Sequence, residues 1–342
     1  MKNSKKIIVF TLFFLILLFS FYFFIWQGIY TPVSLGSKRE VAFEIKKGEG
    51  GNEISFNLKK ENLIRSGISF RLYILFKGYS RRLQAGQYLL SSSMPVPEIV
   101  QKFVSGETIK EKITIIEGWN GKEIAAYFEE KGISNAEEFL NFINSPQPFF
   151  QEFEFLKDKP KSSGLEGYLF PDTYEVKKGE SLEEIIKKML KNFDRKLTSD
   201  LREKISQQGK TIFEVVTMAS MIEKELLNTE ECKNCKELVS GILEKRLEQG
   251  IPLQVDATIS YITGKKTTQI SIEDTKIDSP YNTYKYRDLP IGPISNPGLE
   301  SILAAIYPQE SEYRYYLSTP DGKTIFSKTL KEHNIAKAKY LR

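Results

Sequence analysis

The longest apolar stretch of the chain lies near its start, from Ile7 to Trp26, and only Thr11 and Ser20 interrupt it. About 20 apolar residues in a helix are enough to cross the roughly 30 Å hydrocarbon core of a bilayer. A cleaved signal peptide is the alternative, but it usually has a shorter apolar stretch and a small-residue cleavage site. Here the stretch ends in Phe-Tyr-Phe-Phe-Ile-Trp. The pattern therefore predicts a retained transmembrane helix.

The charges beside this helix predict its orientation. Lys2, Lys5 and Lys6 precede the apolar stretch, and flanking segments rich in lysine and arginine stay in the cytoplasm. We therefore expect residues 1–6 to be cytoplasmic and residues 7–26 to be a single-pass anchor in the cell membrane. The rest of the chain would then lie on the outer, periplasmic or extracytoplasmic side.

Beyond the helix, a pattern of alternating apolar residues, a glycine and apolar residues four apart occurs three times. The copy that begins at Phe43 reads Phe-Glu-Ile-Lys-Lys-Gly-Glu-Gly-Gly-Asn-Glu-Ile. The copy that begins at Tyr174 reads Tyr-Glu-Val-Lys-Lys-Gly-Glu-Ser-Leu-Glu-Glu-Ile, and a looser copy begins at Ile115. Alternation is typical of a half-buried strand and a spacing of four is typical of a helix, so each copy predicts a strand, a turn and a helix. The residues in equivalent places are Gly48, Gly118 and Gly179 in the turn, and Ile54, Ile124 and Ile185 in the helix.

The first copy and the residues that follow it resemble a LysM module, the small βααβ fold that binds N-acetylated glycans in cell walls. The resemblance extends from about Val41 to Gly106. A strand, a turn and a helix of this kind also occur in folds that have no glycan site. The sequence leaves both interpretations open.

The strongest helix predicted in the second half begins at Thr211 and carries two carboxylates near its end, Glu223 and Glu225. Residues two apart on a helix point about 200° apart, so these two carboxylates cannot share one site. Glu223 falls inside the apolar stripe of the helix and Glu225 lies at its edge. A Glu-Lys-Glu sequence usually forms a solvated face, but here large apolar residues continue up to it. At a spacing of 3.6 residues, the stripe consists of Ile212, Val215, Val216, Ala219, Ile222 and Leu226.

Three later segments are dense in proline, glycine, amide and aromatic residues. They are Leu253-Gln-Val-Asp-Ala-Thr, Ser279-Pro-Tyr-Asn-Thr-Tyr and Pro290-Ile-Gly-Pro-Ile-Ser-Asn-Pro-Gly. Such sequences cannot continue a helix or a central strand, so they predict fixed loops. Their hydroxyls, amides and rings suit a sugar chain, which offers hydroxyl groups for hydrogen bonds and apolar ring faces for stacking. Tight structural loops without a ligand are the alternative.

From Glu166 onward the chain resembles the YceG-like family, the endolytic murein transglycosylases. With the membrane helix and the LysM-like part, the resemblance covers nearly the whole chain. The matching segments, in the family's order, are Glu166-Gly-Tyr-Leu-Phe-Pro-Asp-Thr-Tyr, Ala219-Ser-Met-Ile-Glu-Lys-Glu, Arg246-Leu-x-x-Gly-x-x-Leu-Gln-x-Asp-x-Thr, Ser279-Pro-Tyr-Asn-Thr-Tyr, Asn296-Pro-Gly and Glu332-His-Asn. The departures from the family's pattern are Leu226, Ala257, Asp288 and Ile291, and none of them removes a carboxylate.

The resemblance implies cleavage of the MurNAc-β-1,4-GlcNAc bond of nascent glycan strands, which leaves a 1,6-anhydroMurNAc end. Most glycosidases need two carboxylates. In this reaction the C6 hydroxyl of the sugar is itself the nucleophile, so one glutamic acid can act as general acid and then as base. The acid must be protonated near neutral pH, so burial has to raise its pKa from the reference value of about 4.3.

The burial pattern favours Glu223 as this acid, whereas comparison with other lytic transglycosylases favours Glu225, and we assign Glu225. Glu223 is then a buried carboxylate beside the site, or the alternative acid, with Lys224, Arg246 or a backbone amide as its partner. The substrate-binding residues that we expect are Glu166, Gln254, Asp256, Thr258, Tyr281, Asn282, Thr283 and Tyr284, with Asp172 as a further candidate beside Glu166. The residues that we expect to fix loops are Asn296, Pro297, Gly298, His333 and Asn334.

Taken together, the patterns predict an α+β protein. We expect an N-terminal transmembrane helix, a LysM-like βααβ domain at 40–107, a small linking α/β unit at 108–160 and an α+β catalytic transglycosylase domain at 161–342. Peptidoglycan glycan strands would be its substrate, and wall-synthesis proteins would be its partners at the membrane. A non-catalytic wall-binding scaffold and a glycan hydrolase that uses water are the alternatives.

Composition and charge argue against nucleic acid, metal ions and cofactors as ligands. The net charge is only +5 over 342 residues, and no basic block is dense enough for nucleic acid. Cys232, Cys235 and the single histidine, His333, are too few for a zinc site of about four ligands. We therefore expect no metal and no cofactor, and the two cysteines to be a loop disulfide or a free pair.

Overall fold

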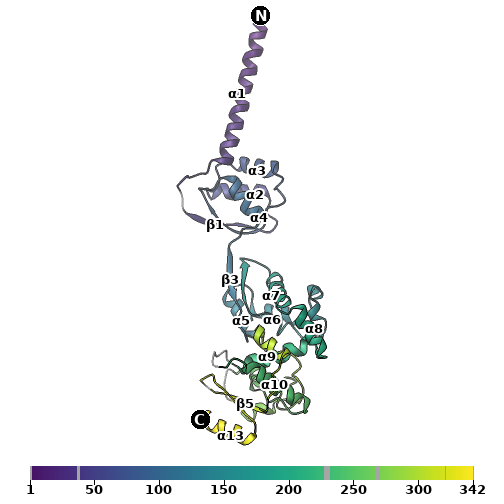
Figure 1. Ribbon diagram of the computed structural model, residues 1–342. Helices are drawn as coiled ribbons and strands as arrows, with labels where there is room; N and C mark the ends of the chain where they lie inside the picture. The colour runs from purple at the N-terminus through teal and green to yellow at the C-terminus, as the bar shows by residue number, and fades with distance from the viewer. Residues whose placement is uncertain (1, 37–38, 227–231, 266–269, 320, 342) are drawn as a thin grey trace. The chain divides into compact units, whose positions relative to one another are not determined.

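The computed structural model describes residues 2–36, 39–226, 232–265, 270–319 and 321–341. The protein has a mixed α+β fold, as expected, with an apolar N-terminal helix (Figure 1). Its chain divides into two compact units, Met1–Lys112 with Glu175–Glu180, and Ile113–Tyr174 with Ser181–Arg342.

Helix α1, Lys2–Tyr30, contains the predicted membrane span. Within the described part of the chain, Ile7–Tyr30 is the one segment that is helical, long and apolar enough to cross a bilayer; its mean hydropathy is 2.8, and its most apolar 18-residue stretch has no buried residue. Because apolar side chains this exposed are unfavourable in water, the helix suggests a single-pass membrane anchor. The span extends one turn beyond the predicted end at Trp26. Its orientation stays a prediction.

The first unit folds around an antiparallel pair of strands, β1 and β2, whose register runs from Glu40 opposite Ser91 to Ile45 opposite Gly86. Its elements are β1 (Glu40–Ile45), α2 (Gly51–Lys60), α3 (Gly67–Phe76), β2 (Gly86–Ser91) and α4 (Val96–Ser105). The largest buried side chains of its core are Phe43, Leu58, Phe70, Tyr88 and Phe103. Its elements follow the order strand, helix, helix, strand and helix. The likeness of this unit to a LysM module and its binding of glycan stay predictions.

The repeated strand, turn and helix occur in the structure. The three turn glycines all have positive φ, 88° at Gly48, 80° at Gly118 and 75° at Gly179, a conformation that side chains disfavour. The third copy consists of β4 (Thr173–Lys177) and α7 (Leu182–Lys196). In the second copy the helix is α5 (Gly121–Glu130), but the strand before it, β3 (Lys110–Thr114), ends one residue before Ile115, where the predicted copy begins. Strands β3 and β4 form a two-stranded sheet with each other.

The second unit is mainly helical and is organised around α9, Ile212–Glu225. Thr211 and Glu214 form a capping box at its N-terminus, which explains why the helix begins there. The remaining elements of this unit are α6 (Ala136–Asn144), η1 (Pro148–Glu152), η2 (Glu154–Leu156), α8 (Ser199–Gln207), α10 (Cys235–Glu248), α11 (Asp256–Thr263), η3 (Asp274–Lys276), α12 (Leu299–Ile306), β5 (Tyr315–Ser318), β6 (Thr324–Ser327) and α13 (Leu330–Tyr340).

Helix α9 is buried over most of its circumference, and the prediction of a single apolar stripe was wrong in this respect. Every residue from Val215 to Glu223 is buried, including Thr217 and Ser220. The reason is that α8, α10, α11 and α12 all pack against α9. The hydroxyls of Thr217 and Ser220 donate to carbonyl groups of their own helix, at 2.8 Å and 2.7 Å, so their burial leaves no donor unpaired.

Most of the linking unit expected at 108–160, residues 113–160, groups with the second compact unit, and a separate linking unit stays a prediction. Hydrogen bonds from the turn of the second copy explain this grouping. The Gly118 N–H donates to the Asn296 carbonyl at 2.9 Å. The Gly121 N–H donates to the Glu166 carboxylate at 2.9 Å.

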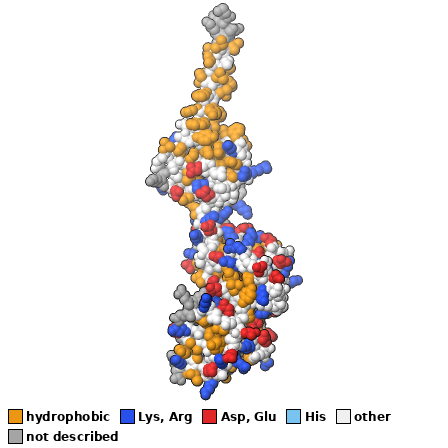
Figure 2. All heavy atoms as spheres, in the orientation of Figure 1, with side chains coloured by type: hydrophobic (Ala, Val, Ile, Leu, Met, Phe, Trp, Pro, Cys, Tyr) orange, Lys and Arg blue, Asp and Glu red, His pale blue; other side chains and the backbone are white. Residues whose placement is uncertain are grey.

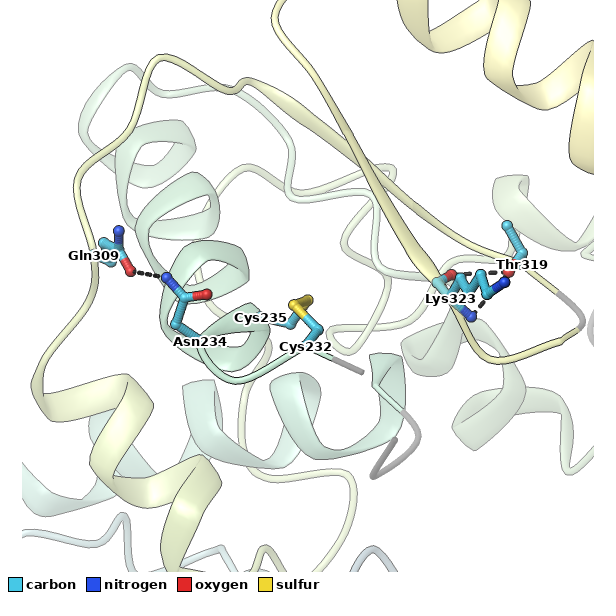
Figure 3. The surroundings of a disulfide bond; sticks show 6 residues. All are labelled: Cys232, Asn234, Cys235, Gln309, Thr319 and Lys323. Atoms are coloured by element: carbon cyan, nitrogen blue, oxygen red, sulfur yellow. Dashed lines mark hydrogen bonds between the residues drawn. A yellow bond between two sulfur atoms is a disulfide. The ribbon is translucent and has the colours of Figure 1, made fainter. Parts of the chain in front are cut away.

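Of the two alternatives for the cysteines, the structure has the disulfide. Cys232 and Cys235 are bonded, with their Cα atoms 5.5 Å apart, and Cys235 is the first residue of α10 (Figure 3). Within the same turn, the Asn234 side-chain amide donates to the Gln309 side chain at 2.7 Å. The disulfide therefore closes the turn that leads into α10.

Candidate functional site

Glu225 is the last residue of α9, and its side chain is only partly exposed. The Ala257 N–H donates to its carboxylate at 3.4 Å, and the Tyr316 hydroxyl donates to it as well. Burial raises the pKa of Glu225 to about 7, and the charge of Asp256 acts in the same direction. The two hydrogen bonds and the charge of Arg246 oppose this shift without cancelling it. A carboxyl with this pKa can donate a proton at neutral pH.

Asp256 and Tyr284 lie beside Glu225 and are linked to each other. The Tyr284 hydroxyl donates to the Asp256 carboxylate, and the Glu225 charge contributes to a raised pKa of Tyr284. Two residues before Asp256, Gln254 has a φ of 54°. This value lies in the left-handed region, which residues with a side chain rarely adopt. Its N–H donates to the Thr283 carbonyl at 3.0 Å, which holds this conformation in place, and its side chain is exposed.

Arg246 holds the segments on both sides of Glu225 in place. Its guanidinium donates to the Leu253 carbonyl at 2.6 Å and to the Arg314 carbonyl at 3.3 Å. It also lies 5.7 Å from the centroid of the Tyr315 ring. These contacts join α10 to the loop before α11 and to β5, the strand that carries Tyr316.

Three residues that we expected to bind substrate are buried and make hydrogen bonds within the protein instead, which corrects that prediction. Thr258, Asn282 and Thr283 are at most 1% exposed. The Asn282 amide donates to the carbonyls of Thr275 and Ile277 at 2.9 Å and 2.7 Å. The Thr283 and Thr258 hydroxyls are hydrogen-bonded to each other at 3.0 Å. Their polar atoms are satisfied internally, so they shape the loops that present Gln254, Asp256, Tyr281 and Tyr284.

Glu223 is buried, 9% exposed, and its carboxylate is fully engaged. The Gly298 N–H and the Ser301 hydroxyl donate to one oxygen at 2.9 Å and 2.7 Å, and the Lys236 ammonium lies 3.6 Å from the other. Of the partners considered from sequence, a backbone amide is the right one, whereas Lys224 donates to the Gly118 carbonyl at 3.2 Å. Glu223 therefore ties α9 to the N-terminus of α12.

Glu166, which is partly exposed, and Asn296, which is buried, form a second hydrogen-bonded group. The Glu166 carboxylate accepts from the Gly121 N–H at 2.9 Å and 3.0 Å, from the Asn296 amide at 3.0 Å and from the Tyr261 hydroxyl at 3.4 Å. Burial raises the pKa of Glu166 to about 7 against these hydrogen bonds. We expected Glu166 to bind substrate. Its contacts give it a role in holding loops together.

The Asn296 side chain joins three segments that are distant in sequence. Its oxygen accepts from the N–H groups of Gly167 and Leu169, both at 2.9 Å, and its amide donates to the Trp119 carbonyl at 2.9 Å and to Glu166. Pro297 and Gly298 follow in the same buried segment. The loop-fixing role of Asn296 stays a prediction, and these four hydrogen bonds are its basis.

Three further residues named in the sequence analysis, Asp172, His333 and Asn334, make no described contact with Glu225. Asp172 accepts from the Asn192 amide at 2.9 Å and from the Thr173 N–H at 2.7 Å. Burial alone would raise its pKa, but these bonds and the charges of Lys196 and Arg195 together outweigh burial and lower it. On α13, His333 is buried with its ring 5.2 Å from that of Tyr315, and burial lowers its pKa. Asn334, the next residue, is exposed.

Sequence reasoning missed four residues of these groups: Tyr316, Tyr261, Lys236 and Ser301. Each lies outside the six short segments on which the sequence resemblance was based, and each comes to its carboxylate through a tertiary contact. The alternation around Tyr316 is a signal for a strand, but it does not indicate which residue the strand approaches. Within the described ranges, no three side chains of the types His, Cys, Asp and Glu gather so that they could hold a metal ion.

Comparison with known proteins identifies the relatives of this chain. A protein named endolytic murein transglycosylase from Bacillus subtilis (strain 168) is 36% identical over 326 residues, which are 92% of this chain and 89% of the relative. A protein of the same name from Streptococcus pneumoniae serotype 2 (strain D39) is 32% identical over 329 residues, 89% of this chain and 59% of the relative.

The fold has a solved counterpart among the same relatives. A crystal structure of a YceG-like protein from Listeria monocytogenes is 34% identical, with a TM-score of 0.59, and the match covers 88% of this chain and all of that one. The sequence profile of the YceG-like family matches residues 43–339. The resemblance seen in the sequence is thereby confirmed: the chain belongs to the YceG-like family.

Proposed function

We propose that this protein is a membrane-anchored endolytic peptidoglycan transglycosylase, which cuts the MurNAc-β-1,4-GlcNAc bond and leaves a 1,6-anhydroMurNAc end. The observation that carries the proposal is the surroundings of Glu225, a partly exposed carboxyl whose burial raises its pKa to about 7. The relatives named endolytic murein transglycosylase, one of them aligned over 92% of this chain, support the substrate class.

The chemistry requires one group that first gives and then takes a proton. The carboxyl proton of Glu225 passes to the leaving O4 oxygen as the bond from this oxygen to C1 breaks. The C6 hydroxyl of the same MurNAc attacks C1, and the Glu225 carboxylate takes the hydroxyl proton. No water is consumed, and Glu225 ends protonated. Because the C6 hydroxyl belongs to the reacting sugar, the attack has the advantage of an intramolecular step.

The neighbours of Glu225 suit the rest of this reaction. Asp256 is a carboxylate beside Glu225 that can stabilise the positive charge developing at C1. The exposed Gln254 and the ring of Tyr281 are candidates to hold the glycan by hydrogen bonding and stacking. The Tyr281 ring centroid lies 5.0 Å from that of Tyr261, a contact that fixes its position.

The same pair of carboxylates supports a second candidate function. A hydrolase uses one carboxyl as acid and a second carboxylate as base or nucleophile, and Asp256 beside Glu225 supplies such a second group. The two functions differ in the product, since a hydrolase adds water to the new end. A non-catalytic wall-binding scaffold is the third alternative, and it has no need of a carboxyl with a raised pKa.

We also propose that the LysM-like domain, residues 40–107, contributes contact with the wall. An open hollow of about 750 Å³ beside the turn between β1 and α2 has polar and charged groups and one exposed ring. Its lining includes Lys46, Glu49, Asn52, Phe56, Asn57 and Arg71. Amides and a ring suit a glycan, as they do in the loops near Glu225.

The orientation and partners follow from the same proposal. With residues 1–6 in the cytoplasm, the second unit reaches nascent strands on the outer side of the membrane, where wall-synthesis proteins work.

The test of the proposed reaction is digestion of purified, uncrosslinked glycan strands by the full-length protein in detergent. We expect the strands to be shortened to intermediate lengths, as internal cuts require. Strands of unchanged length would leave only the scaffold function.

A further inference from the structure

Helix α3, Gly67–Phe76, has more apolar surface than its own unit can bury. Two of its side chains, Phe70 and Ile74, are at most 3% exposed and belong to the core of the first unit. Ile68, Leu75 and Phe76 are 52%, 65% and 83% exposed. At 100° per residue, these three lie on the side of the helix away from the core face. An exposed cluster of large apolar residues of this kind marks a contact surface.

A third face of α3 packs against the last turn of α1. Gly28 approaches this face so closely that an added Cβ would lie 2.2 Å from the Ser69 hydroxyl oxygen and 3.2 Å from the Ser66 Cβ. Ile29 packs against the core of the unit, and Tyr30 is near enough to Tyr73 to raise the pKa of its hydroxyl, after burial as the main cause. The contact fixes α3 at the end of the membrane span, which is Tyr30.

This position brings the exposed face of α3 to the edge of the bilayer. Within the first unit, α3 lies beside the base of α1, and β1 lies further from the free end of α1 (Figure 1). The hydrophobic surface of α1 continues onto the adjoining part of its unit (Figure 2). The exposed face of α3 is therefore continuous with a surface that is itself in contact with lipid if α1 spans the membrane.

The polar residues around this face have the character of a membrane interface. Arg71, Lys77, Arg81 and Arg82 are exposed on or just after α3. Basic side chains at this depth can contact anionic headgroups. The aromatic rings of Trp26 and Tyr30, 5.8 Å apart at the end of the span, are of the kind enriched at the level of the headgroups.

We propose that the exposed face of α3, with Ile68, Leu75 and Phe76 at its centre, is a membrane-docking surface that lies in the interfacial layer of the bilayer crossed by α1. Its partner is a lipid surface, and the basic residues favour anionic headgroups. Docking would hold the first unit against the membrane at two points, the end of α1 and α3. The proposal depends on α1 as a membrane anchor and is independent of the reaction at Glu225.

Depth-dependent fluorescence quenching in vesicles tests this proposal with the full-length chain. Trp26→Phe and Trp119→Phe remove the two native tryptophans, and Phe76→Trp then places one reporter on α3. The matched control is Leu89→Trp in the same background, at an exposed apolar position on β2 of the same unit. Both proteins are reconstituted into vesicles of phosphatidylcholine and phosphatidylglycerol, with and without bromine on the acyl chains.

We expect brominated lipid to quench the Phe76→Trp reporter severalfold more than the Leu89→Trp reporter, since only the former reaches the acyl chains. Equal weak quenching with red-shifted, water-exposed emission would overturn the proposal. Equal weak quenching with blue-shifted emission would overturn it too, because the face would then be covered by protein, such as a second copy of the chain. Both substituted positions are on the surface, so neither variant disturbs the core.

Discussion

Glu223 and Glu225 show how two identical side chains two residues apart are given different tasks by their partners. Glu223 is buried, accepts two hydrogen bonds at 2.7 Å and 2.9 Å and has the Lys236 ammonium 3.6 Å away. Glu225 accepts a long bond of 3.4 Å from the Ala257 N–H and one from Tyr316. A carboxylate that accepts two short hydrogen bonds and faces an ammonium group holds the fold together, whereas one with weaker contacts is free to exchange a proton.

The first prediction concerns these two residues. Glu225→Gln should lower kcat by about 10²–10⁴-fold, the usual effect of losing a general acid, because the amide has nearly the same shape but cannot donate and regain a proton. The unfolding temperature should change little. Glu223→Gln is the matched control and should keep most of its turnover while lowering the unfolding temperature, since Lys236 loses a charged partner. Full turnover in Glu225→Gln together with loss in Glu223→Gln would reverse the assignment.

The second prediction is the pH dependence of the reaction. The proposed acid works in its protonated form, and its pKa is raised to about 7, so kcat/KM should fall as the pH rises through about 7. Asp256→Asn removes a negative charge that helps to raise this pKa, so the fall should begin at lower pH. Measuring kcat/KM for strand shortening against pH checks both statements.

Glu166 provides the control for the pH profile, because its pKa is also raised to about 7. Glu166→Gln keeps an oxygen that can accept from the Gly121 N–H. If Glu225 controls the profile, the alkaline fall of kcat/KM should remain in this variant. Disappearance of the fall in Glu166→Gln would assign the profile to Glu166 instead.

At the residue scale, the sequence was sufficient to select Glu225 as a candidate and insufficient to describe its surroundings. The end of an apolar helix and the family motif both indicated the carboxylates of α9. Tyr316 donates to Glu225 from β5, far along the chain, and no local pattern indicates such a contact. Thr258, in the first turn of α11, and Asn282, in a loop, are polar residues whose sequence resembles that of a ligand site, and only their burial reveals the structural role.

At the scale of elements, buried polar side chains connect segments of the second unit that are distant in sequence. Asn296 connects the loop that contains Trp119, the loop at Gly167 and the segment before α12. Glu223 connects α9 to α12. These contacts keep the C-terminal end of α9, and with it Glu225, in a fixed position relative to the loops.

The third prediction follows from the four hydrogen bonds of the Asn296 side chain. Asn296→Ala leaves the N–H groups of Gly167 and Leu169 without an acceptor, whereas the Trp119 carbonyl keeps the backbone N–H of residue 296 as a donor. At about 1–3 kcal/mol for each of the two buried groups left unpaired, the free energy of unfolding should fall by about 2–6 kcal/mol. Asn334→Ala, on the exposed side of α13, should change it by less than about 0.5 kcal/mol. Denaturant unfolding of both variants checks this; equal stabilities would contradict it.

The repeated strand, turn and helix could be predicted because the information is local. Alternation, a glycine with positive φ and apolar residues four apart each act within one copy. The all-round burial of α9 could not be predicted in this way, since it depends on which helices pack against it. Thr217 and Ser220, for example, have polar side chains, which are usually exposed, yet both are buried in the fold.

At the scale of the molecule, the two compact units suggest that wall contact and cleavage are separable. The fourth prediction is that deletion of residues 41–106 leaves measurable activity on soluble strands while weakening retention on insoluble wall material. Strands β3 and β4 both lie outside the deleted range, so the sheet they form can persist. Fewer glycan contacts should reduce the avidity of binding.

Pull-down on purified peptidoglycan, with circular dichroism of the same sample, checks the fourth prediction. Unchanged retention would mean that the first unit is structural and does not bind glycan. Loss of the helical signal beyond that of the deleted helices would mean that the second unit does not fold without the first.

The fifth prediction is that the mature protein keeps its N-terminus. The helix continues without a break from Lys2 to Tyr30, and the apolar stretch ends in large residues that signal peptidases do not favour. Protein extracted from membranes should therefore give the sequence that begins at or next to Met1. A sequence that begins after Trp26 would contradict the membrane anchor.

The central claim is that the sugar's own hydroxyl, and no water, attacks the bond that Glu225 helps to break. Digestion of purified glycan strands in water enriched with heavy oxygen, followed by mass spectrometry of the products, tests it most directly. The account predicts new ends of the 1,6-anhydroMurNAc type, lighter by one water than reducing ends and free of heavy oxygen. Reducing MurNAc ends that carry heavy oxygen would contradict it and would assign the pair Glu225 and Asp256 to a hydrolase.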